Sequence, residues 1–271
     1  MDKYAVIGNP IAHSKSPEIH AAFAQQTGEA ITYGRILGNL DDYPGDIRHF
    51  LSEGGKGLNV TVPFKEEAWQ LVDELSPRAQ TAGAVNTLIL LDGNRLRGDN
   101  TDGAGLIRDL TVNQGFRLEG KHILILGAGG AVRGVIRPLL EQKPQRVIIA
   151  NRTATKAYSL ACALASHGEV VGCGLDELEG MQFDLVINGT AAGLGGEVPD
   201  VPDGILAPGG WCYDMLYSNQ ATAFQTWGRK HRAARSLDGL GMLVEQAAES
   251  FYLWRGILPE TEAVIAMIRC L

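Results

Sequence analysis

The stretch Ile123-Leu124-Ile125-Leu126-Gly127-Ala128-Gly129-Gly130-Ala131 decides the fold of the second half of this 271-residue chain. Four consecutive aliphatic residues are typical of a strand that is buried on both faces. Glycines at a strand-to-helix turn let backbone amides approach a pyrophosphate at the positive end of the next helix, expected here over Val132 to Glu141. The stretch therefore predicts a dinucleotide site, with Val132 as a departure from the third glycine of G-x-G-x-x-G. The alternative is a tight turn with a purely structural role.

The next strand, Arg146 to Ala150, indicates which dinucleotide is bound. In NAD-binding units an Asp or Glu at the end of this strand holds the ribose 2′-hydroxyl. Here the strand is followed by Asn151-Arg152-Thr153-Ala154-Thr155-Lys156, which contains no acid. An Arg and a Lys with hydroxyls between them suit a 2′-phosphate, so NADP is favoured. The alternative is a solvated helix start that Thr153 caps.

The strand-and-helix rhythm continues on both sides of this unit, which predicts a parallel sheet covered on both faces. The glycine- and proline-rich stretch from Gly193 to Gly210 is expected to form an irregular loop. Further strands are expected at Glu169 to Cys173, Asp184 to Asn188 and Trp211 to Asp214, and helices at Gly241 to Trp254 and Pro259 to Arg269.

The first hundred residues show the same rhythm in a looser form. A hairpin is expected where Asn86 to Leu91 and Arg95 to Gly98 flank an Asp-Gly turn. The capping residues Asp99 to Gly103 open a helix that ends near Gly115 and can link two domains. The other expected elements are strands at Tyr4 to Ile7, Thr32 to Ile36 and Leu58 to Val62, and helices at Ser16 to Gln26, Asp41 to Leu51 and from about Pro63.

Composition and charge exclude several classes of protein. The net charge is −7 and no basic run is present, which argues against nucleic-acid or anionic-membrane partners. No apolar stretch approaches the roughly 20 residues needed to span a bilayer, and the N-terminus lacks a signal pattern, so a cytoplasmic location is expected. The four scattered cysteines and six histidines form no ligand motif, so a reduced, metal-free protein is expected.

Two polar clusters in the first half are candidates for substrate binding. Ser14 and Ser16 precede Pro17, which places Ser16 as a helix N-cap. Exposed amides and two hydroxyls at a helix N-terminus can bind a carboxylate, and the alternative is a cap without a ligand. Asn59 and Thr61 alternate with valines, so their side chains share one face at the carboxyl end of a strand.

Lys65 and Asp102 are the candidates for proton transfer. Lys65 falls in the first turn of the helix that follows Asn59 and Thr61. Asp102 belongs to the cluster of capping residues Asp99 to Gly103. The alternative is that it acts only as a helix cap. A catalytic interpretation of either residue depends on the other as its partner.

These motifs, in this order, resemble shikimate dehydrogenases over essentially the whole chain. The matching stretches are Gly8 to Pro17, Gly57 to Lys65, Gly83 to Thr87, Gly98 to Gly103, Gly127 to Ala131, Asn151 to Thr153, Tyr213 to Met215 and Asp238 to Gln246.

The resemblance implies the reversible NADPH-dependent reduction of 3-dehydroshikimate to shikimate in aromatic amino-acid biosynthesis. It also implies that Lys65 and Asp102 are the catalytic pair. Implied substrate contacts are Ser14 and Ser16 for the carboxylate, and Asn59, Thr61, Asn86, Tyr217 and Gln246 for the ring hydroxyls or their neighbours. The implied cofactor site comprises Gly127, Ala128, Gly129, Gly130, Ala131, Asn151, Arg152, Thr153 and Lys156, with Met215 and Gly239 along the nicotinamide.

The implied architecture is α/β with two domains and an active site between them. Residues 1–102 form an N-terminal α/β substrate domain, which the C-terminal helices of residues 239–271 complete. Residues 103–238 form a Rossmann-type, doubly wound NADP-binding domain. A monomer or a homodimer is expected. The alternatives are a quinate/shikimate dehydrogenase with broader substrate use and a regulatory protein that binds nucleotide without catalysis.

Overall fold

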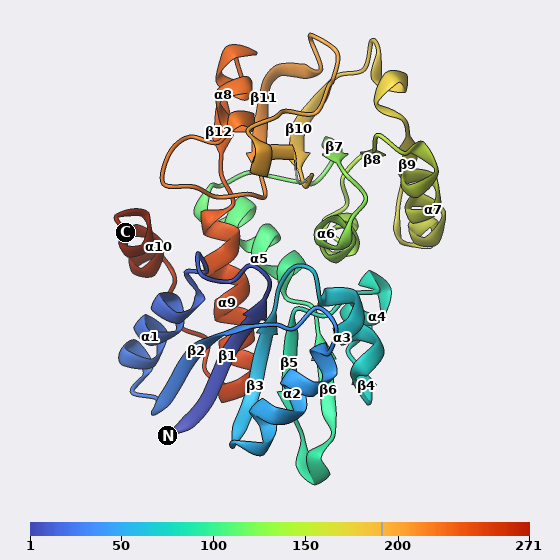
Figure 1. The fold of residues 1–271 in the computed structure, drawn as a ribbon. Helices are drawn as coiled ribbons and strands as arrows, with labels where there is room; N and C mark the ends of the chain where they lie inside the picture. The colour runs from blue at the N-terminus through green and yellow to red at the C-terminus, as the bar shows by residue number, and fades with distance from the viewer. Residues whose placement is uncertain (191) are drawn as a thin grey trace. The chain divides into compact units, whose positions relative to one another are not determined.

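The computed structural model describes residues 1–190 and 192–271. The chain divides into two compact units, of which the first comprises residues 1–105 and 243–271 and the second residues 106–242. Each unit is built around its own six-stranded sheet (Figure 1).

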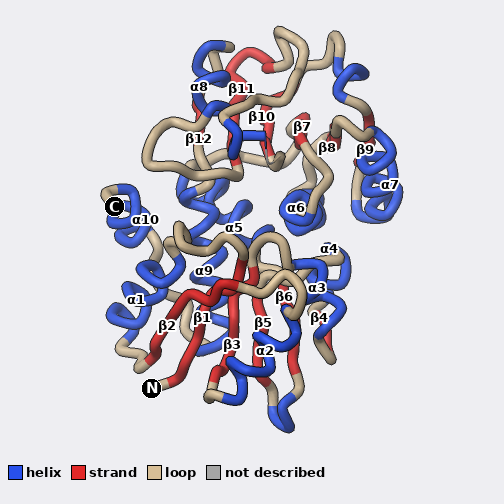
Figure 2. Tube along the Cα trace, viewed as in Figure 1, coloured by secondary structure: helices blue, strands red, loops and turns tan. Residues whose placement is uncertain are grey.

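The sheet of the first unit has the order β2-β1-β3-β5-β6-β4. The pairings make β5 the one strand that runs against the others, because it is antiparallel to both of its neighbours. Figure 2 shows the loops after β1 and β3 gathered at one end of this sheet. Its strands are β1 (Asp2–Gly8), β2 (Ile31–Leu37), β3 (Gly55–Val60), β4 (Glu74–Leu75), β5 (Thr87–Leu90) and β6 (Leu96–Asp99).

Helices cover both faces of this sheet, as the alternation along β1 requires. Tyr4 stacks on Trp254 of α9, while Ala5 and Ile7 join the core that includes Tyr43 of α2. Figure 1 shows α9 behind the strands and α2 in front of them. The helices are α1 (Ser16–Thr27), α2 (Tyr43–Ser52), α3 (Lys65–Leu71), α4 (Pro77–Ala82), α5 (Asp102–Arg108), α9 (Leu240–Arg255) and α10 (Glu262–Arg269).

Two predictions for this half need correction, and two short elements were missed. The N-cap of α1 is Lys15 instead of Ser16, because the Ser16 amide already has a partner in the Ser14 hydroxyl and lies within the helix. Strand β3 ends at Val60, so Thr61 follows the strand. The short elements β4 and α4 were not predicted, since neither is long enough to display a period.

The sheet of the second unit has the order β12-β11-β10-β7-β8-β9, and all its strands are parallel. This is the strand order of doubly wound dinucleotide-binding folds. In such folds ligands bind beyond the carboxyl ends of the two central strands, here β7 and β10, where the strand order reverses. The predicted fold class is thereby confirmed. The strands are β7 (His122–Leu126), β8 (Arg146–Ala150), β9 (Val170–Cys173), β10 (Phe183–Asn188), β11 (Leu206–Asp214) and β12 (Arg235–Leu237).

The apolar run in β7 is explained by two cores, one on each face of the sheet. Ile123 and Ile125 belong to one core, and Leu124 and Leu126 belong to the other. All four side chains are fully buried. The helices of this unit are α6 (Gly130–Leu140), α7 (Ala154–Leu164) and α8 (Ala223–Lys230), and the helix of α5 continues into a π turn at Asp109–Asn113.

The prediction for the glycine- and proline-rich stretch was partly wrong. Residues Leu206 to Gly210 extend β11, and Ala192–Gly195 form a 3-10 turn. Leu206 pairs with Phe183 in β10 after a shift of register, so tertiary pairing overrides the local composition there. Strand β12 and helix α8 were not predicted.

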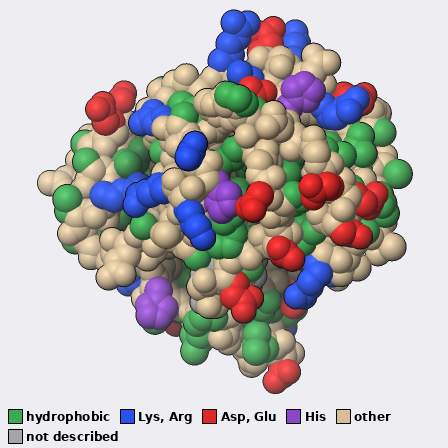
Figure 3. Space-filling model, turned by 90° about the horizontal axis from the view of Figure 1, so that it is seen from above, with side chains coloured by type: hydrophobic (Ala, Val, Ile, Leu, Met, Phe, Trp, Pro, Cys, Tyr) green, Lys and Arg blue, Asp and Glu red, His purple; other side chains and the backbone are tan. Residues whose placement is uncertain are grey.

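Several general features accompany the fold. In the part of the chain that the structure describes, every helix is too short or too polar to cross a bilayer. The same residues contain no cluster of His, Cys, Asp or Glu arranged to hold a metal ion, and the four cysteines are free. On the face seen in Figure 3, basic and acidic side chains are interspersed.

Candidate active site

The first unit brings Lys65 and Asp102 into direct contact. Lys65 is the first residue of α3 and Asp102 the first residue of α5. Lys65 Nζ donates to Asp102 Oδ2 at 2.6 Å, with the side chains 16% and 8% exposed. The pair therefore combines a nearly buried carboxylate with an ammonium group that keeps limited access to solvent.

Asp102 is fixed from three directions. Its second carboxylate oxygen accepts a hydrogen bond from the Asn86 amide at 2.8 Å. Its backbone amide donates to the Asn100 side chain at 3.1 Å. Asn86 is itself anchored, because its side-chain oxygen accepts from the Thr101 amide at 2.9 Å. These bonds leave Asp102 little rotational freedom.

The two serines form a second polar cluster at the start of α1. Ser14 Oγ donates to Ser16 Oγ at 3.2 Å. Arg35 of β2 holds the loop by donating to the Ser14 carbonyl at 2.6 Å, and it also pairs with Glu18. Burial opposes ionisation of Glu18, but its hydrogen bond with Arg35 gives it a lowered pKa overall. The cluster presents two hydroxyls beside the Arg35–Glu18 ion pair.

Asn59 lies between these clusters and has little free hydrogen-bonding capacity. It is buried, and its amide donates to the Asn86 carbonyl, Thr87 and Ser250 at 3.0 to 3.3 Å. Its side-chain oxygen accepts from the Tyr33 hydroxyl at 2.7 Å. The geometry thus gives Asn59 a role in holding its neighbours.

The remaining predicted substrate residues fall in three places. Gln246 of α9 accepts hydrogen bonds from Asn86 and Thr101 at 3.3 Å, so the returning C-terminal segment reaches the same cluster. Thr61 is partly exposed just beyond β3, where its amide donates to the Ile7 carbonyl. Tyr217 belongs to the second unit and lies in the loop after β11.

Sequence reasoning missed two hydroxyls that complete this network. Ser250, within α9, is fully buried and bonds to Asn59, Thr87 and Thr101. Tyr33, within β2, bonds to Asn59. Neither residue lies in a motif. For Ser250 the sequence offers one signal, which is its position as a polar residue on an otherwise apolar face of a helix.

In the second unit, the glycine-rich turn follows β7 as predicted. Gly127 has φ +108°, a conformation that favours glycine, and its amide donates to the Ala150 carbonyl. Gly129 is the N-cap of α6, and side chains added at Gly129 or Gly130 would meet open space. The first-turn amides of α6 are therefore accessible to an anion such as a pyrophosphate.

Val132 stands where the G-x-G-x-x-G pattern has its third glycine. The larger side chain fits because the residue that faces it, Gly189, has none. The Val132 side chain is fully buried in the core. A Cβ atom at Gly189, in the loop after β10, would overlap the Val132 side chain. The space required for close packing is thus provided by Gly189.

The loop after β8 presents free positive charge. Arg152, Thr153 and Lys156 are exposed at the start of α7. Neither Arg152 nor Lys156 forms an ion pair with any acidic residue in the part of the chain that the structure describes. The Asn151 side chain closes the turn by donating to the Thr153 carbonyl at 3.0 Å. The residues present therefore fit a 2′-phosphate.

Met215 is held by the loops on either side of it. Its amide donates to the Asn188 carbonyl at 2.9 Å, and a Cβ atom at Gly239 would overlap the Met215 carbonyl. Asp214 ties these loops together by accepting from Asn188 at 3.0 Å and from the Leu216 amide at 3.2 Å. Burial raises the pKa of Asp214, against these hydrogen bonds.

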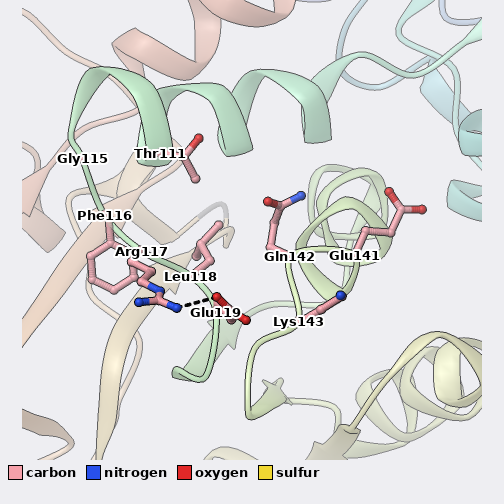
Figure 4. Close-up of a pocket in the computed structure, with 9 residues that line it drawn as sticks. All are labelled: Thr111, Gly115, Phe116, Arg117, Leu118, Glu119, Glu141, Gln142 and Lys143. Atoms are coloured by element: carbon pink, nitrogen blue, oxygen red, sulfur yellow. Dashed lines mark hydrogen bonds and ion pairs between the residues drawn. The ribbon is translucent and has the colours of Figure 1, made fainter.

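A cavity of about 490 Å³ lies elsewhere in the second unit and contains none of the predicted site residues. It is lined by the loop before β7 and by the residues at the end of α6 (Figure 4). Within the loop before β7, Arg117 pairs with Glu119. This position is at the amino end of β7, whereas doubly wound sheets bind ligands at the carboxyl ends of their strands.

Comparison with known proteins identifies the family. Models described as the shikimate dehydrogenase substrate binding domain, shikimate/quinate 5-dehydrogenase and shikimate 5′-dehydrogenase C-terminal domain match residues 6–88, 110–194 and 239–268. The shikimate dehydrogenase (NADP(+)) of Alkalilimnicola ehrlichii is 59% identical over 268 residues, covering 99% of this chain and 98% of that protein. The chain belongs to the shikimate dehydrogenase family.

Further relatives and solved structures are similar to this chain over nearly its full length. The shikimate dehydrogenase (NADP(+)) of Hahella chejuensis is 55% identical, covering 99% of each chain. The Ael1 enzyme of Pseudomonas putida has a TM-score of 0.91 at 45% identity, covering 98% of each chain. Shikimate 5-dehydrogenase of Thermus thermophilus, solved with NADP(H) and shikimate, has a TM-score of 0.88 at 33% identity, covering 100% of this chain and 99% of that one.

Proposed function

We propose that this chain catalyses the reversible, NADPH-dependent reduction of 3-dehydroshikimate to shikimate, a step in aromatic amino-acid biosynthesis. The observation that carries this proposal is the direct Lys65–Asp102 contact within a polar network, in a chain of the shikimate dehydrogenase family. The alternative, a regulatory protein that binds nucleotide without catalysis, does not explain why Lys65 and Asp102 are held in contact.

The substrate carboxylate binds at Ser14 and Ser16. Their hydroxyls lie together at the start of α1, where the positive end of the helix and the Lys15 charge favour an anion, while the Arg35 charge is balanced by Glu18. Asn86, Gln246 and Thr61 receive the ring hydroxyls, and Asn59 holds the Asn86 segment in place. By the family resemblance, Tyr217 is a further substrate contact.

Lys65 and Asp102 together carry out the proton transfer. Reduction of the substrate carbonyl adds a hydride to carbon and leaves negative charge on oxygen. The ammonium group of Lys65 donates a proton to that oxygen, and a proton from solvent then restores it. Asp102 orients the ammonium group and accepts a hydrogen bond from the neighbouring substrate hydroxyl. A positioned acid of this kind contributes about 10²- to 10⁴-fold in rate.

The second unit would hold the cofactor, and NADPH supplies the hydride when it is bound. The backbone of Gly127, Ala128, Gly129, Gly130 and Ala131 would hold the pyrophosphate. Asn151, Arg152, Thr153 and Lys156 would hold the adenosine 2′-phosphate. By the family resemblance, Met215 and Gly239 would border the nicotinamide. The Met215 amide is held on the Asn188 carbonyl and the Gly239 amide on the Leu216 carbonyl.

Residues 1–102 with 239–271 form the substrate domain of this proposal, and residues 103–238 form the cofactor domain. Kinship with biosynthetic enzymes favours a cytoplasmic location, and the protein acts as a monomer or a homodimer.

The test is the absorbance of reduced nicotinamide after the protein is mixed with NADP and shikimate. An increase at 340 nm is expected, with a smaller one or none for quinate. Rapid reduction with quinate would support the broader quinate/shikimate activity. Absence of reduction with both acids would contradict the proposed function.

A further inference from the structure

We infer that Arg78, in α4, is a positioning residue for the Lys65–Asp102 pair. It acts through Asp99, which lies three residues before Asp102 at the end of β6. The inference rests on the proposed function and extends it to a side chain outside the family motifs quoted above. Its support is a chain of hydrogen bonds that leads from the guanidinium group of Arg78 to the backbone of Asp102.

The Asp99 carboxylate is the centre of this arrangement. Its side chain is 3% exposed, and Arg78 Nε and Nη2 donate to its two oxygens at 2.6 and 3.2 Å. Its Oδ1 also accepts from the Ser76 hydroxyl at 2.5 Å and from the Asn100 amide at 2.7 Å. A guanidinium group that contacts both oxygens of a buried carboxylate fixes its orientation as well as balancing its charge.

Asn100 connects this carboxylate to Asp102. Its amide is held by Asp99, and its side-chain oxygen accepts from the Asp102 amide at 3.1 Å. Its side-chain nitrogen donates to the Ala84 carbonyl at 3.0 Å. Because Asn100 is buried, solvent cannot readily replace these bonds. A shift of Asp99 would therefore move the first residue of α5.

A second path leads from Asp99 through Asn86. The Asp99 carbonyl accepts from the Asn86 amide at 3.0 Å, and the Asn86 side chain donates to Asp102 Oδ1 at 2.8 Å. Both the backbone and the carboxylate of Asp102 thus depend on residues that Asp99 holds. Since Lys65 donates to the other carboxylate oxygen, a displaced Asp102 would also misplace the proton donor.

Arg78 also ties helix α9 to this region. Its Nη1 donates to Glu249 Oε1 at 2.9 Å, although the two residues are 171 positions apart. Glu249 follows Gln246 by one helical turn, and Gln246 belongs to the proposed substrate site. The two side chains of this ion pair are 28% and 27% exposed, so the pair is weaker than the buried contact with Asp99. One guanidinium group therefore contacts both segments of the site.

The test is the variant Arg78→Met, which keeps a long side chain without its charge. We expect kcat for shikimate oxidation to fall about 10- to 100-fold, because a small misplacement of catalytic groups is costly. KM for shikimate should rise by less than about fivefold, since Ser14 and Ser16 are held separately at the start of α1.

A solvent isotope effect separates positioning from stability. The deuterium isotope effect on kcat should increase in Arg78→Met, because proton transfer at Lys65 becomes slower relative to the other steps. A purely structural role would lower the free energy of unfolding without changing the isotope effect of the folded enzyme.

The matched control is Arg255→Met in the same unit. Arg255 also bridges two carboxylates, those of Asp2 and Glu29, and it is 23% exposed. These residues lie at the amino ends of β1 and β2, whereas Asp99 lies at the carboxyl end of β6. We expect Arg255→Met to lower the free energy of unfolding and to leave kcat and its isotope effect unchanged.

A double variant keeps the inference falsifiable if Arg78→Met fails to fold. Combining Arg78→Met with Asp99→Asn removes the buried charge together with its partner, so the protein should be more stable than the single variant. The new amide has no guanidinium group to orient it, so kcat should stay at least about tenfold below the wild-type value.

A kcat within about threefold of the wild type in either Arg78 variant would overturn the inference. An equal fall in kcat for Arg255→Met, or an unchanged isotope effect in Arg78→Met, would do the same. An inactive wild-type protein would instead contradict the proposed function.

Discussion

Lys65 Nζ lies 2.6 Å from Asp102 Oδ2, although the two residues are 37 positions apart and begin different helices. The other Asp102 oxygen is occupied by Asn86. A nearly buried carboxylate with two donors cannot turn away from the ammonium group without losing a hydrogen bond. The protein thus maintains the orientation of the group that we assign to proton transfer.

Lys65→Ala should lower kcat by about 10²- to 10⁴-fold while changing the KM for shikimate much less. The double variant with Asp102→Asn should be little worse than the poorer single variant, because the two residues act as one unit. Steady-state kinetics in both directions measure this. The control is Lys121→Ala, which breaks another lysine–aspartate pair, with Asp184, in the second unit. A near-normal kcat in Lys65→Ala would refute the assignment.

The sequence predicted the members of this pair but not the connections around it. Lys65 and Asp102 each lie in a motif, and the resemblance paired them. Ser250 and Tyr33 lie in an ordinary helix and an ordinary strand, so their hydroxyls acquire a role only when the fold supplies Asn59 as a neighbour. Tertiary hydrogen bonds of this kind have no local pattern.

Arg152→Ala should weaken NADP binding by about 10- to 150-fold and leave NAD almost unaffected, because a charge-assisted bond contributes about 1.5 to 3 kcal/mol. Lys156→Ala should have a smaller effect, and Arg152→Asp a larger one, since an acid repels the phosphate. Fluorescence titration with both cofactors measures this. The control is Arg146→Ala at the opposite end of β8, where the arginine pairs with Glu169. Equal losses for both cofactors would show that Arg152 does not contact the 2′-phosphate.

Gly189→Ala should destabilise the protein by about 1 to 3 kcal/mol, because the added methyl group overlaps the buried Val132 side chain. Adding Val132→Ala should restore part of that loss, although Val132→Ala alone is destabilising. Urea unfolding of the single and double variants measures the coupling. Gly196→Ala is unsuitable as a control because its φ is +76°, so Gly195→Ala, which meets open space, is preferred. Simple additivity would contradict the packing relationship between Val132 and Gly189.

The strands of the second unit were more predictable than its loops. Both faces of β7 are covered, so the apolar run alone identifies a buried strand. Residues Leu206 to Gly210 include a proline and two glycines, and they join β11 only because Phe183 offers a pairing partner. Local composition therefore predicts a strand well where burial is two-sided and poorly where a single neighbour decides the outcome.

The last prediction concerns His20, whose pKa burial lowers to about 3 in the folded protein. An unfolded histidine titrates near pH 6.5, so between these values the unfolded chain binds a proton that the native protein does not. The free energy of unfolding should therefore fall as the pH drops, by about 2 kcal/mol from this group at pH 5. His20→Phe, which keeps an aromatic ring beside Tyr33, should lose that part of the pH dependence in urea unfolding between pH 7.5 and 5. The variant His13→Gln, at an exposed position, is the control for the loss of a histidine as such. An unchanged slope in His20→Phe would mean that His20 is not held neutral by burial.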